Sequence, residues 1–127
     1  MKPRALFIGR FSPFHLGHDA VIRRVLDDGE PVLVAVFERP LSASDPWSAE
    51  ERAAMIREHY ANEDVVVVVI PNISSVNIGR TVGYGIRTID VPEVETISGT
   101  SIRDAIRRGD SSWRNDVPAS VANWIDK

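Results

Sequence analysis

Two histidines three positions apart, His15 and His18, are the side chains in this sequence best suited to chemistry. They end a stretch from Gly9 to His18 that reads GRFSPFHLGH. If a helix opens there, side chains at this spacing project to one side, next to free backbone amides and the positive end of the helix dipole. Gly17 between them leaves room for a phosphate or a nucleobase, so the stretch suits a polyphosphate.

Other interpretations of this stretch are a structural metal site and a pair of histidines that are only packed or solvated. The sequence has no cysteine and one further histidine, His59, which disfavours the metal. The turn after Gly9 is neither a Walker A loop nor a dinucleotide-binding fingerprint. The specific signal is therefore the whole string and not any part of it.

A second candidate anion site lies near the C-terminal end, where Ile97–Arg103 reads ISGTSIR. Hydroxyl and amide groups at the start of a helix form a ready anion site, and an arginine one turn in adds a forked donor. The groups concerned belong to Ser98, Gly99, Thr100, Ser101 and Arg103. The competing interpretation is an ordinary cap in which Ser101 pairs with Asp104 while Arg103 is a solvated surface charge.

The elements that must position these residues follow from the periodicity of apolar side chains. Short apolar runs over Arg4–Gly9, Val32–Phe37 and Val65–Ile70 predict strands, and Ile86–Val91 is a candidate fourth. Helices are expected over Ala20–Leu26, from the capping box of Ser48 and Glu51 to Tyr60, from Ser101 to Gly109, and over Val117–Ile125. This order predicts an α/β fold with a parallel sheet of four to five strands, helices on both faces, and ligands beyond the strand carboxyl ends.

Composition limits the class of protein. We expect residues 1–127 to form one domain, and the 43% hydrophobic and 26% charged residues are ordinary for a soluble protein. A formal net charge of −3 gives no broad cationic surface for nucleic acid, so an anion needs a local cluster. Without cysteine, disulfides and thiolate metal sites are excluded. Because no signal segment or bilayer-length apolar run is found, we expect a cytoplasmic protein without a membrane partner.

The motifs resemble those of a known family. Gly9–His18 resembles the HxGH signature of the nucleotidyltransferase superfamily, which has a Rossmann-like fold, and its wider form is most similar to archaeal-type nicotinamide mononucleotide adenylyltransferases. Ile97–Arg103 resembles the Ile-Ser-x-Thr-x-x-Arg motif that grips the triphosphate in that superfamily. Pro46–Arg52 is similar to the helix start of adenylyltransferases, and Val117-Pro118 to a Val-Pro element of the archaeal type. The chain is identified as a shortened member.

The resemblance implies an activity and a set of site residues. It implies transfer of AMP from ATP to a phosphorylated small molecule, preferably nicotinamide mononucleotide, by in-line displacement that gives NAD and pyrophosphate. Catalytic roles would fall to His15, His18 and Arg103. Nucleotide binding would fall to Gly9, Arg10, Phe11, Ser12, Gly17, Ser98, Gly99, Thr100 and Ser101. Mg²⁺ would arrive with the triphosphate, held by phosphate oxygens and water, so no dedicated protein metal site is expected.

The acceptor is less well defined, because Asn72–Tyr84 is shorter than the matching segment of archaeal-type relatives. Trp47 is a candidate to stack on the acceptor ring, and the alternative is that it packs at a helix entrance. Arg80 is a candidate to hold the acceptor phosphate, and the alternative is that it lies in a surface loop. Trp113 and Trp124 are assigned to packing. A cytidylyltransferase acting on a phosphorylated alcohol and a non-catalytic nucleotide-binding module stay as alternatives, and assembly into homo-oligomers is left open.

Overall fold

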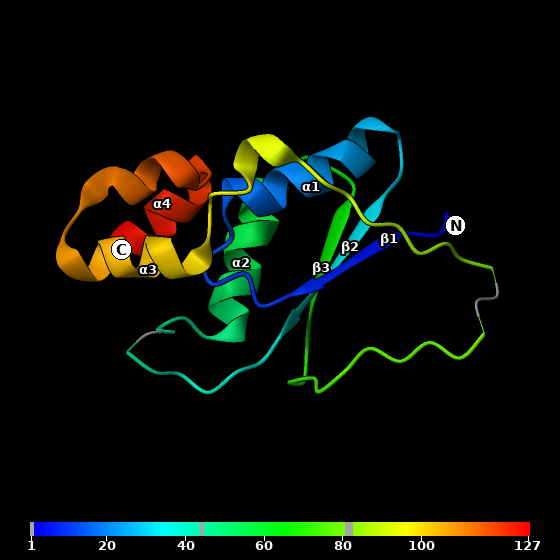
Figure 1. The fold of residues 1–127 in the computed structure, drawn as a ribbon, viewed down its shortest axis with the longest axis horizontal. Coiled ribbons are helices and arrows are strands. Elements are labelled where there is room, and N and C mark those ends of the chain that lie inside the picture. The colour runs from blue at the N-terminus through cyan, green and yellow to red at the C-terminus, as the bar shows by residue number, and fades with distance from the viewer. Residues whose placement is uncertain (1, 44, 81–82) are drawn as a thin grey trace.

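The computed structural model describes residues 2–43, 45–80 and 83–127. Met1, Ser44, Thr81 and Val82 lie outside the described residues, and the last two belong to the segment expected near the acceptor. Along the chain the elements are β1 (Ala5–Gly9), α1 (Leu16–Asp27), β2 (Val32–Phe37), α2 (Ala49–His59), β3 (Val65–Ile70), a 3-10 turn (Pro92–Val94), α3 (Gly99–Arg108), a second 3-10 segment (Ser111–Asp116) and α4 (Ala119–Asp126) (Figure 1).

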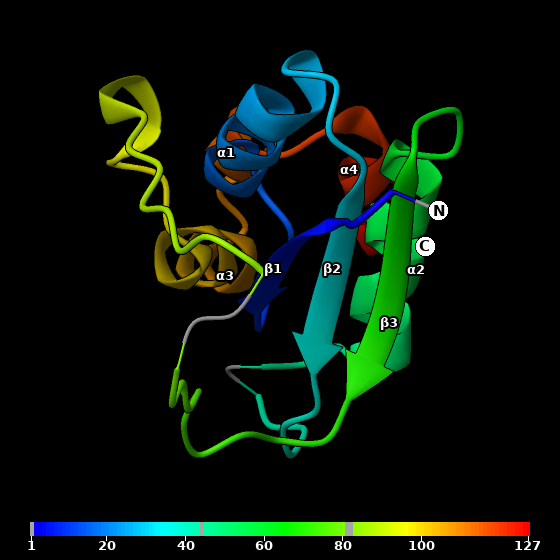
Figure 2. The ribbon, with the colours of Figure 1, turned by 90° about the vertical axis from the view of Figure 1, so that its right-hand side faces the viewer.

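The three strands form one parallel sheet in the order β1-β2-β3. Their register aligns Gly9 with Val36, and Val36 with Val69, so the three carboxyl ends lie at one edge (Figure 2). The loop that carries the histidines leaves from this edge, as ligand-binding loops do in parallel sheets. The predicted bounds of β2 and β3 are confirmed, and β1 begins one residue later than expected.

Both helices that connect the strands lie on the same face of the sheet, which Figure 1 shows nearly edge-on. Two right-handed crossovers that move in the same direction along a sheet have this result. Side chains of the covered face, such as Val34 and Val67, join one core with Ile22 of α1 and Ile56 of α2. On the other face, the exposed hydrophobic side chains are those of Leu6, Ile8 and Val66. The expectation of helices on both faces is therefore wrong for the described residues.

The expected fourth strand is also absent from the described part of the chain. Ile86–Val91 makes no ladder, and the sheet has three strands where four to five were expected. Ile89 packs against the core, but most of the segment is exposed, so solvent can satisfy its backbone groups. Arg87 pairs instead with Glu30 beyond the end of α1, at 2.8 Å.

The helix ends explain how the site is built. The capping box of α2 is confirmed: the Glu51 amide donates to Ser48 Oγ, and the Ser48 amide to Glu51 Oε1, both at 3.1 Å. The helix α1 begins at Leu16, four residues before the apolar period indicated, because His15 serves as its N-cap. Gly109, with φ of 74°, ends α3 as predicted.

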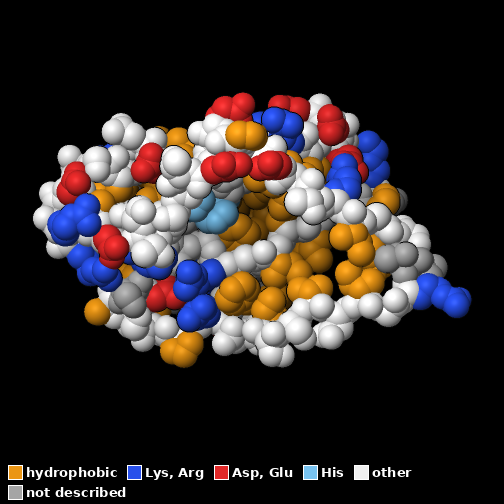
Figure 3. All heavy atoms as spheres, in the orientation of Figure 1, with side chains coloured by type: hydrophobic (Ala, Val, Ile, Leu, Met, Phe, Trp, Pro, Cys, Tyr) orange, Lys and Arg blue, Asp and Glu red, His pale blue; other side chains and the backbone are white. Residues whose placement is uncertain are grey.

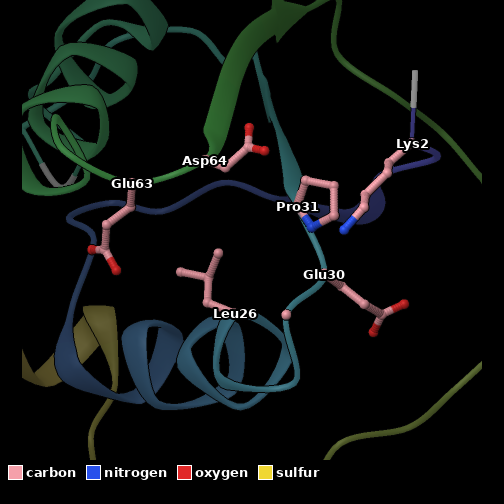
Figure 4. A pocket seen from close by; sticks show the side chains of 7 residues that line it. Lys2, Leu26, Glu30, Pro31, Glu63 and Asp64 are labelled. Carbon is pink, nitrogen blue, oxygen red and sulfur yellow. The ribbon is translucent and has the colours of Figure 1, made fainter.

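A hollow of about 340 Å³ lies at the opposite edge of the sheet, where the strands begin (Figure 4). Its lining includes the carboxylates of Glu30, Glu63 and Asp64. Each of these acids is paired with an arginine, and Lys2 adds an amine to the lining. None of the helices in the described residues is long and apolar enough to cross a membrane.

Candidate functional site

The loop after β1 is held in shape from inside. Phe11 has a φ of 52°, in the left-handed region that costs a non-glycine residue free energy, and its ring is buried. The ring lies so close to Gly9 that a Cβ there would be 2.8 Å from it. Ser12 is buried too, and its hydroxyl donates to Asp45. Phe11 and Ser12, both expected to bind the nucleotide, thus have side chains that shape the loop.

His15 and His18 cap the start of α1 reciprocally. Nδ1 of His15 accepts the amides of Gly17 and His18, and Nδ1 of His18 accepts the amide of His15 at 3.1 Å. The two rings stack with centroids 3.7 Å apart. A Cβ on Gly17 would lie 2.8 Å from Cε1 of His15, so this glycine makes room for the histidine ring. The sequence analysis assigned that room to a ligand, and in the structure the ring of His15 also requires it.

Burial keeps both imidazoles neutral. It lowers the pKa of His15 to about 4, and burial together with the neighbouring His15 lowers the pKa of His18 to about 3. Because each Nδ1 accepts a hydrogen bond, the proton of each neutral ring sits on Nε2. The pair therefore offers two neutral N–H donors and no imidazolium charge at neutral pH.

The start of α3 meets the histidine loop directly. Arg103 donates from Nη1 to the Ser12 carbonyl, 91 positions away in the chain, and from Nη2 to Thr100 Oγ1 at 3.3 Å. The approach is close at Gly99, where a Cβ would lie 2.9 Å from the same carbonyl oxygen. The two motifs that lie far apart in sequence are thus neighbours in space.

The cap of α3 differs from the expected one. Ser98 is the N-cap, and its Oγ accepts the Ser101 amide at 3.1 Å, while Asp104 pairs with Arg107. The predicted pairing of Ser101 with Asp104 is therefore wrong, and the helix begins at Gly99. The physical reason is that Ser98 has the extended backbone of a cap. As a result the amides of Gly99 and Thr100 fall in the first turn, where no intrahelical acceptor exists.

A buried arginine, Arg52, lies beneath the candidate site. The sequence analysis did not single it out as a site residue. The side chain of Arg52, in α2, is fully buried and donates to the carbonyls of Arg10, Phe37 and Trp47. It thereby joins the loops that follow β1 and β2. A charged residue is expected at the surface unless it is paired, so composition and spacing gave no signal for this burial. The only hint was its place at the end of the Pro46–Arg52 motif.

Positive charge gathers at this edge of the sheet. Burial and then the charge of Arg10 lower the pKa of Arg103, and burial is also the largest cause of the lowered pKa of Arg52. The carboxylate of Asp45 opposes both shifts. In Figure 3 a histidine is visible beside the hollowed centre of one face, with Lys and Arg side chains below it and Asp and Glu side chains above it. Several guanidinium groups near one carboxylate favour the binding of a further anion.

The two tentative acceptor residues are not brought to this place. Trp47 is half-buried and packs against the core at the entrance of α2, which favours the packing interpretation. Arg80 is exposed, in a segment that Figure 1 shows well separated from α3 along the longest axis of the molecule. The packing roles of Trp113 and Trp124 are confirmed. Within the described residues, no three acidic or histidine side chains are grouped so that they could hold a metal ion.

Known proteins resemble this chain over most of its length. A nicotinamide-nucleotide adenylyltransferase of Pyrobaculum neutrophilum is 34% identical over an alignment of 154 residues, covering 96% of this chain and 86% of the relative. A protein of the same name from Picrophilus torridus is 29% identical, and the alignment covers 98% of this chain and 90% of the relative. Nicotinamide-nucleotide adenylyltransferase 1 of Sulfolobus acidocaldarius is 28% identical, and the alignment covers 96% of this chain and 88% of the relative. The alignments exceed this chain's 127 residues, so these relatives contain residues that it lacks.

Among solved structures, a bifunctional NMN adenylyltransferase/ADP ribose pyrophosphatase from Francisella tularensis, complexed with AMP and a Mn ion, is 28% identical with a TM-score of 0.49. The overlap covers 57% of this chain and 23% of that one. The family model described as cytidylyltransferase-like matches residues 6–78, which include the histidine loop, the buried arginine, β2, β3 and all of β1 except Ala5. This match over more than half of the sequence shows that the chain belongs to the cytidylyltransferase-like family.

Proposed function

We propose that this chain is an adenylyltransferase that transfers AMP from ATP to nicotinamide mononucleotide and releases pyrophosphate. Relatives named for this activity align with almost the whole chain. The structural observation that carries the proposal is the hydrogen bond from Arg103, in the first turns of α3, to the Ser12 carbonyl of the histidine loop. It makes one cradle from two helix starts, which is the arrangement that a long polyphosphate needs.

The reaction is a direct displacement at the α-phosphorus of ATP. A phosphate oxygen of the acceptor forms the new bond, and the bond to the oxygen that bridges to the β-phosphate breaks, with its electron pair leaving on pyrophosphate. The attacking oxygen is already ionised at neutral pH, so no general base is required. The protein's part is to position two anions and to stabilise charge that develops on oxygen.

Each half of the cradle takes a part of the triphosphate. The Nε2–H of His18 would donate to the α-phosphate as charge develops there, and that of His15 would donate along the chain of phosphates. The β- and γ-phosphates would lie against the start of α3, with Ser98, Thr100 and Arg103 as donors and Arg10 beside them. The neutral N–H groups of the two histidines suit this task, because neither ring has to be protonated before it can donate a hydrogen bond to the transition state.

Magnesium enters as part of the substrate, MgATP. The ion prefers phosphate oxygens and water to an all-protein cage. Among the described residues, no three acidic or histidine side chains lie close enough together to hold a metal ion. This arrangement supports an ion that is held by the substrate. Arg10 and Arg103 would then supply donors to the phosphate oxygens.

A second candidate is a cytidylyltransferase acting on a phosphorylated alcohol. The observation in its favour is the description of the matching family model, which names cytidylyl transfer. The same cradle would hold the phosphates of CTP, so the two candidates differ in the base and the acceptor and not in the phosphate chemistry. The names of the relatives favour the adenylyl reaction.

The experiment is a substrate panel with pyrophosphate release as the readout. Purified protein is incubated with MgATP or MgCTP and with nicotinamide mononucleotide or glycerol phosphate, each nucleotide also without acceptor. We expect release with MgATP and nicotinamide mononucleotide alone. Release that depends on CTP and glycerol phosphate would select the second candidate. Binding of ATP without release in any combination would make the chain a nucleotide-binding module and refute both reactions.

A further inference from the structure

A polar cluster outside the proposed nucleotide contacts ties the first turn of α1 to the end of α2. We name Asp19, His59 and Tyr60 the Asp19 cluster. Oδ1 of Asp19 accepts the Tyr60 hydroxyl at 2.5 Å and lies 3.0 Å from Nε2 of His59. Arg23, one turn further along α1, places Nη2 3.6 Å from the same oxygen. The cluster therefore joins residues that lie about 40 positions apart in the chain.

The ring of Phe14 stands between this cluster and the histidine pair. It is fully buried, with its centroid 5.5 Å from that of His18, 5.9 Å from that of His59 and 5.7 Å from that of Tyr60. Asp19 also follows His18 directly in the chain. The imidazole of His18 is thus connected to the cluster in two ways. One is the backbone of the first turn of α1, and the other is the buried ring of Phe14, which cannot shift without repacking of its neighbours.

The charges of the cluster make the connection firm. Burial alone would raise the pKa of Asp19, but hydrogen bonds from His59 and Tyr60 together with nearby positive charge, that of Arg23 included, lower it below the usual range. Burial and the bond to Asp19 raise the pKa of Tyr60, so its hydroxyl keeps its proton and donates. An ionised carboxylate in a first helical turn is also favoured by the helix dipole. The first turn of α1 is therefore anchored at the residue next to His18.

We propose that the Asp19 cluster is a positioning element that holds the His18 imidazole in the direction needed for transfer. The proposal rests on the function proposed above. Tyr60 and Asp19 touch neither nucleotide nor acceptor in this account. They act through Phe14 and the first turn of α1. Loosening them should misdirect the Nε2–H of His18 during the reaction while leaving most contacts to ground-state ATP in place.

The first test is a split between turnover and binding in Tyr60→Phe, which removes one oxygen. Thr88→Val is the control, because it removes one hydroxyl at an exposed residue outside the segment expected near the acceptor. We expect kcat of Tyr60→Phe to fall about tenfold while KM for ATP stays within about twofold, and Thr88→Val to match the parent. Parent values of kcat in Tyr60→Phe, even with a lowered Tm, would overturn the proposal and leave the cluster a structural role. If Tyr60→Phe does not fold, His59→Gln takes its place under the same criteria.

The second readout needs no activity and so separates this inference from the proposed function. Long-range proton–nitrogen NMR of the imidazole rings reports which nitrogen of His18 carries the proton. We expect the parent and Thr88→Val to show one Nε2–H form, and Tyr60→Phe to show exchange broadening or a mixture. An inactive parent in which Tyr60→Phe still disturbs His18 would refute the proposed reaction and retain the positioning role. An unchanged His18 signal would refute the positioning role itself.

Discussion

Each histidine of the pair uses Nδ1 to cap the helix, which places the ring proton on Nε2, the atom that we propose donates to the triphosphate. The spacing in sequence predicts that the two side chains share one side of a helix start, and the structure agrees. The stacking of the rings and their neutral charge state could not be predicted, because both depend on burial by residues elsewhere in the chain. The same holds for Asp45 and Arg52, whose charge alone suggests exposure.

Neutral, buried histidines have a consequence for stability. In the unfolded chain both rings gain protons near pH 6.5, whereas the folded protein resists protonation until about pH 4 for His15 and pH 3 for His18. The unfolded state therefore binds more protons as the pH falls below about 6.5, and stability is lost in that direction. Each ring should contribute a slope of up to about 1.4 kcal/mol per pH unit in the free energy of unfolding.

Urea unfolding at several values between about pH 7 and pH 4.5 measures this slope. In His15→Asn we expect the slope to fall by about 1 kcal/mol per pH unit, because one of the two sites is gone. A slope identical to that of the parent would mean that His15 is not held neutral by the fold.

At the scale of elements, the site depends on how closely α3 approaches the histidine loop. The motif in Ile97–Arg103 predicted a helix start there, and the structure has one, but beginning at Gly99 with Ser98 as its cap. The sequence could not reveal the contact with the Ser12 carbonyl, because nothing in a single sequence reports which distant carbonyl an arginine reaches. Gly99 makes this approach possible, since any side chain there would meet that carbonyl.

Replacing this glycine should separate the two halves of the cradle. In Gly99→Ala the new methyl group would lie 2.9 Å from the Ser12 oxygen, so the backbone must shift. We expect kcat/KM for ATP to fall by about tenfold to a hundredfold, because a shift of about 1 Å in a positioned group has an effect of this size. Gly85→Ala is the control, because a Cβ at Gly85 has no neighbour within 4 Å. Equal values for the two variants would show that the close approach is not needed.

At the scale of the whole molecule, a protein with a net charge of −3 concentrates positive charge at one edge of its sheet. The valine-rich runs of β2 and β3 predicted their strands with the correct bounds, because such runs are too short for core helices. Alternating strands and helices also predicted the parallel order. The number of strands and the faces of the sheet that helices cover could not be predicted in this way. Side chains on an uncovered face, such as Leu6 and Val66, are as apolar as those on a covered face.

In the proposed reaction His18 and Arg103, from two helix starts, act on one triphosphate. The most direct measurement is the rate of pyrophosphate release from MgATP and nicotinamide mononucleotide by His18→Ala and Arg103→Ala, with the affinity for MgATP measured beside it. We predict that His18→Ala loses at least about a hundredfold in turnover while its affinity falls only modestly, and that Arg103→Ala loses affinity as well. Turnover in His18→Ala equal to that of the parent would contradict the account.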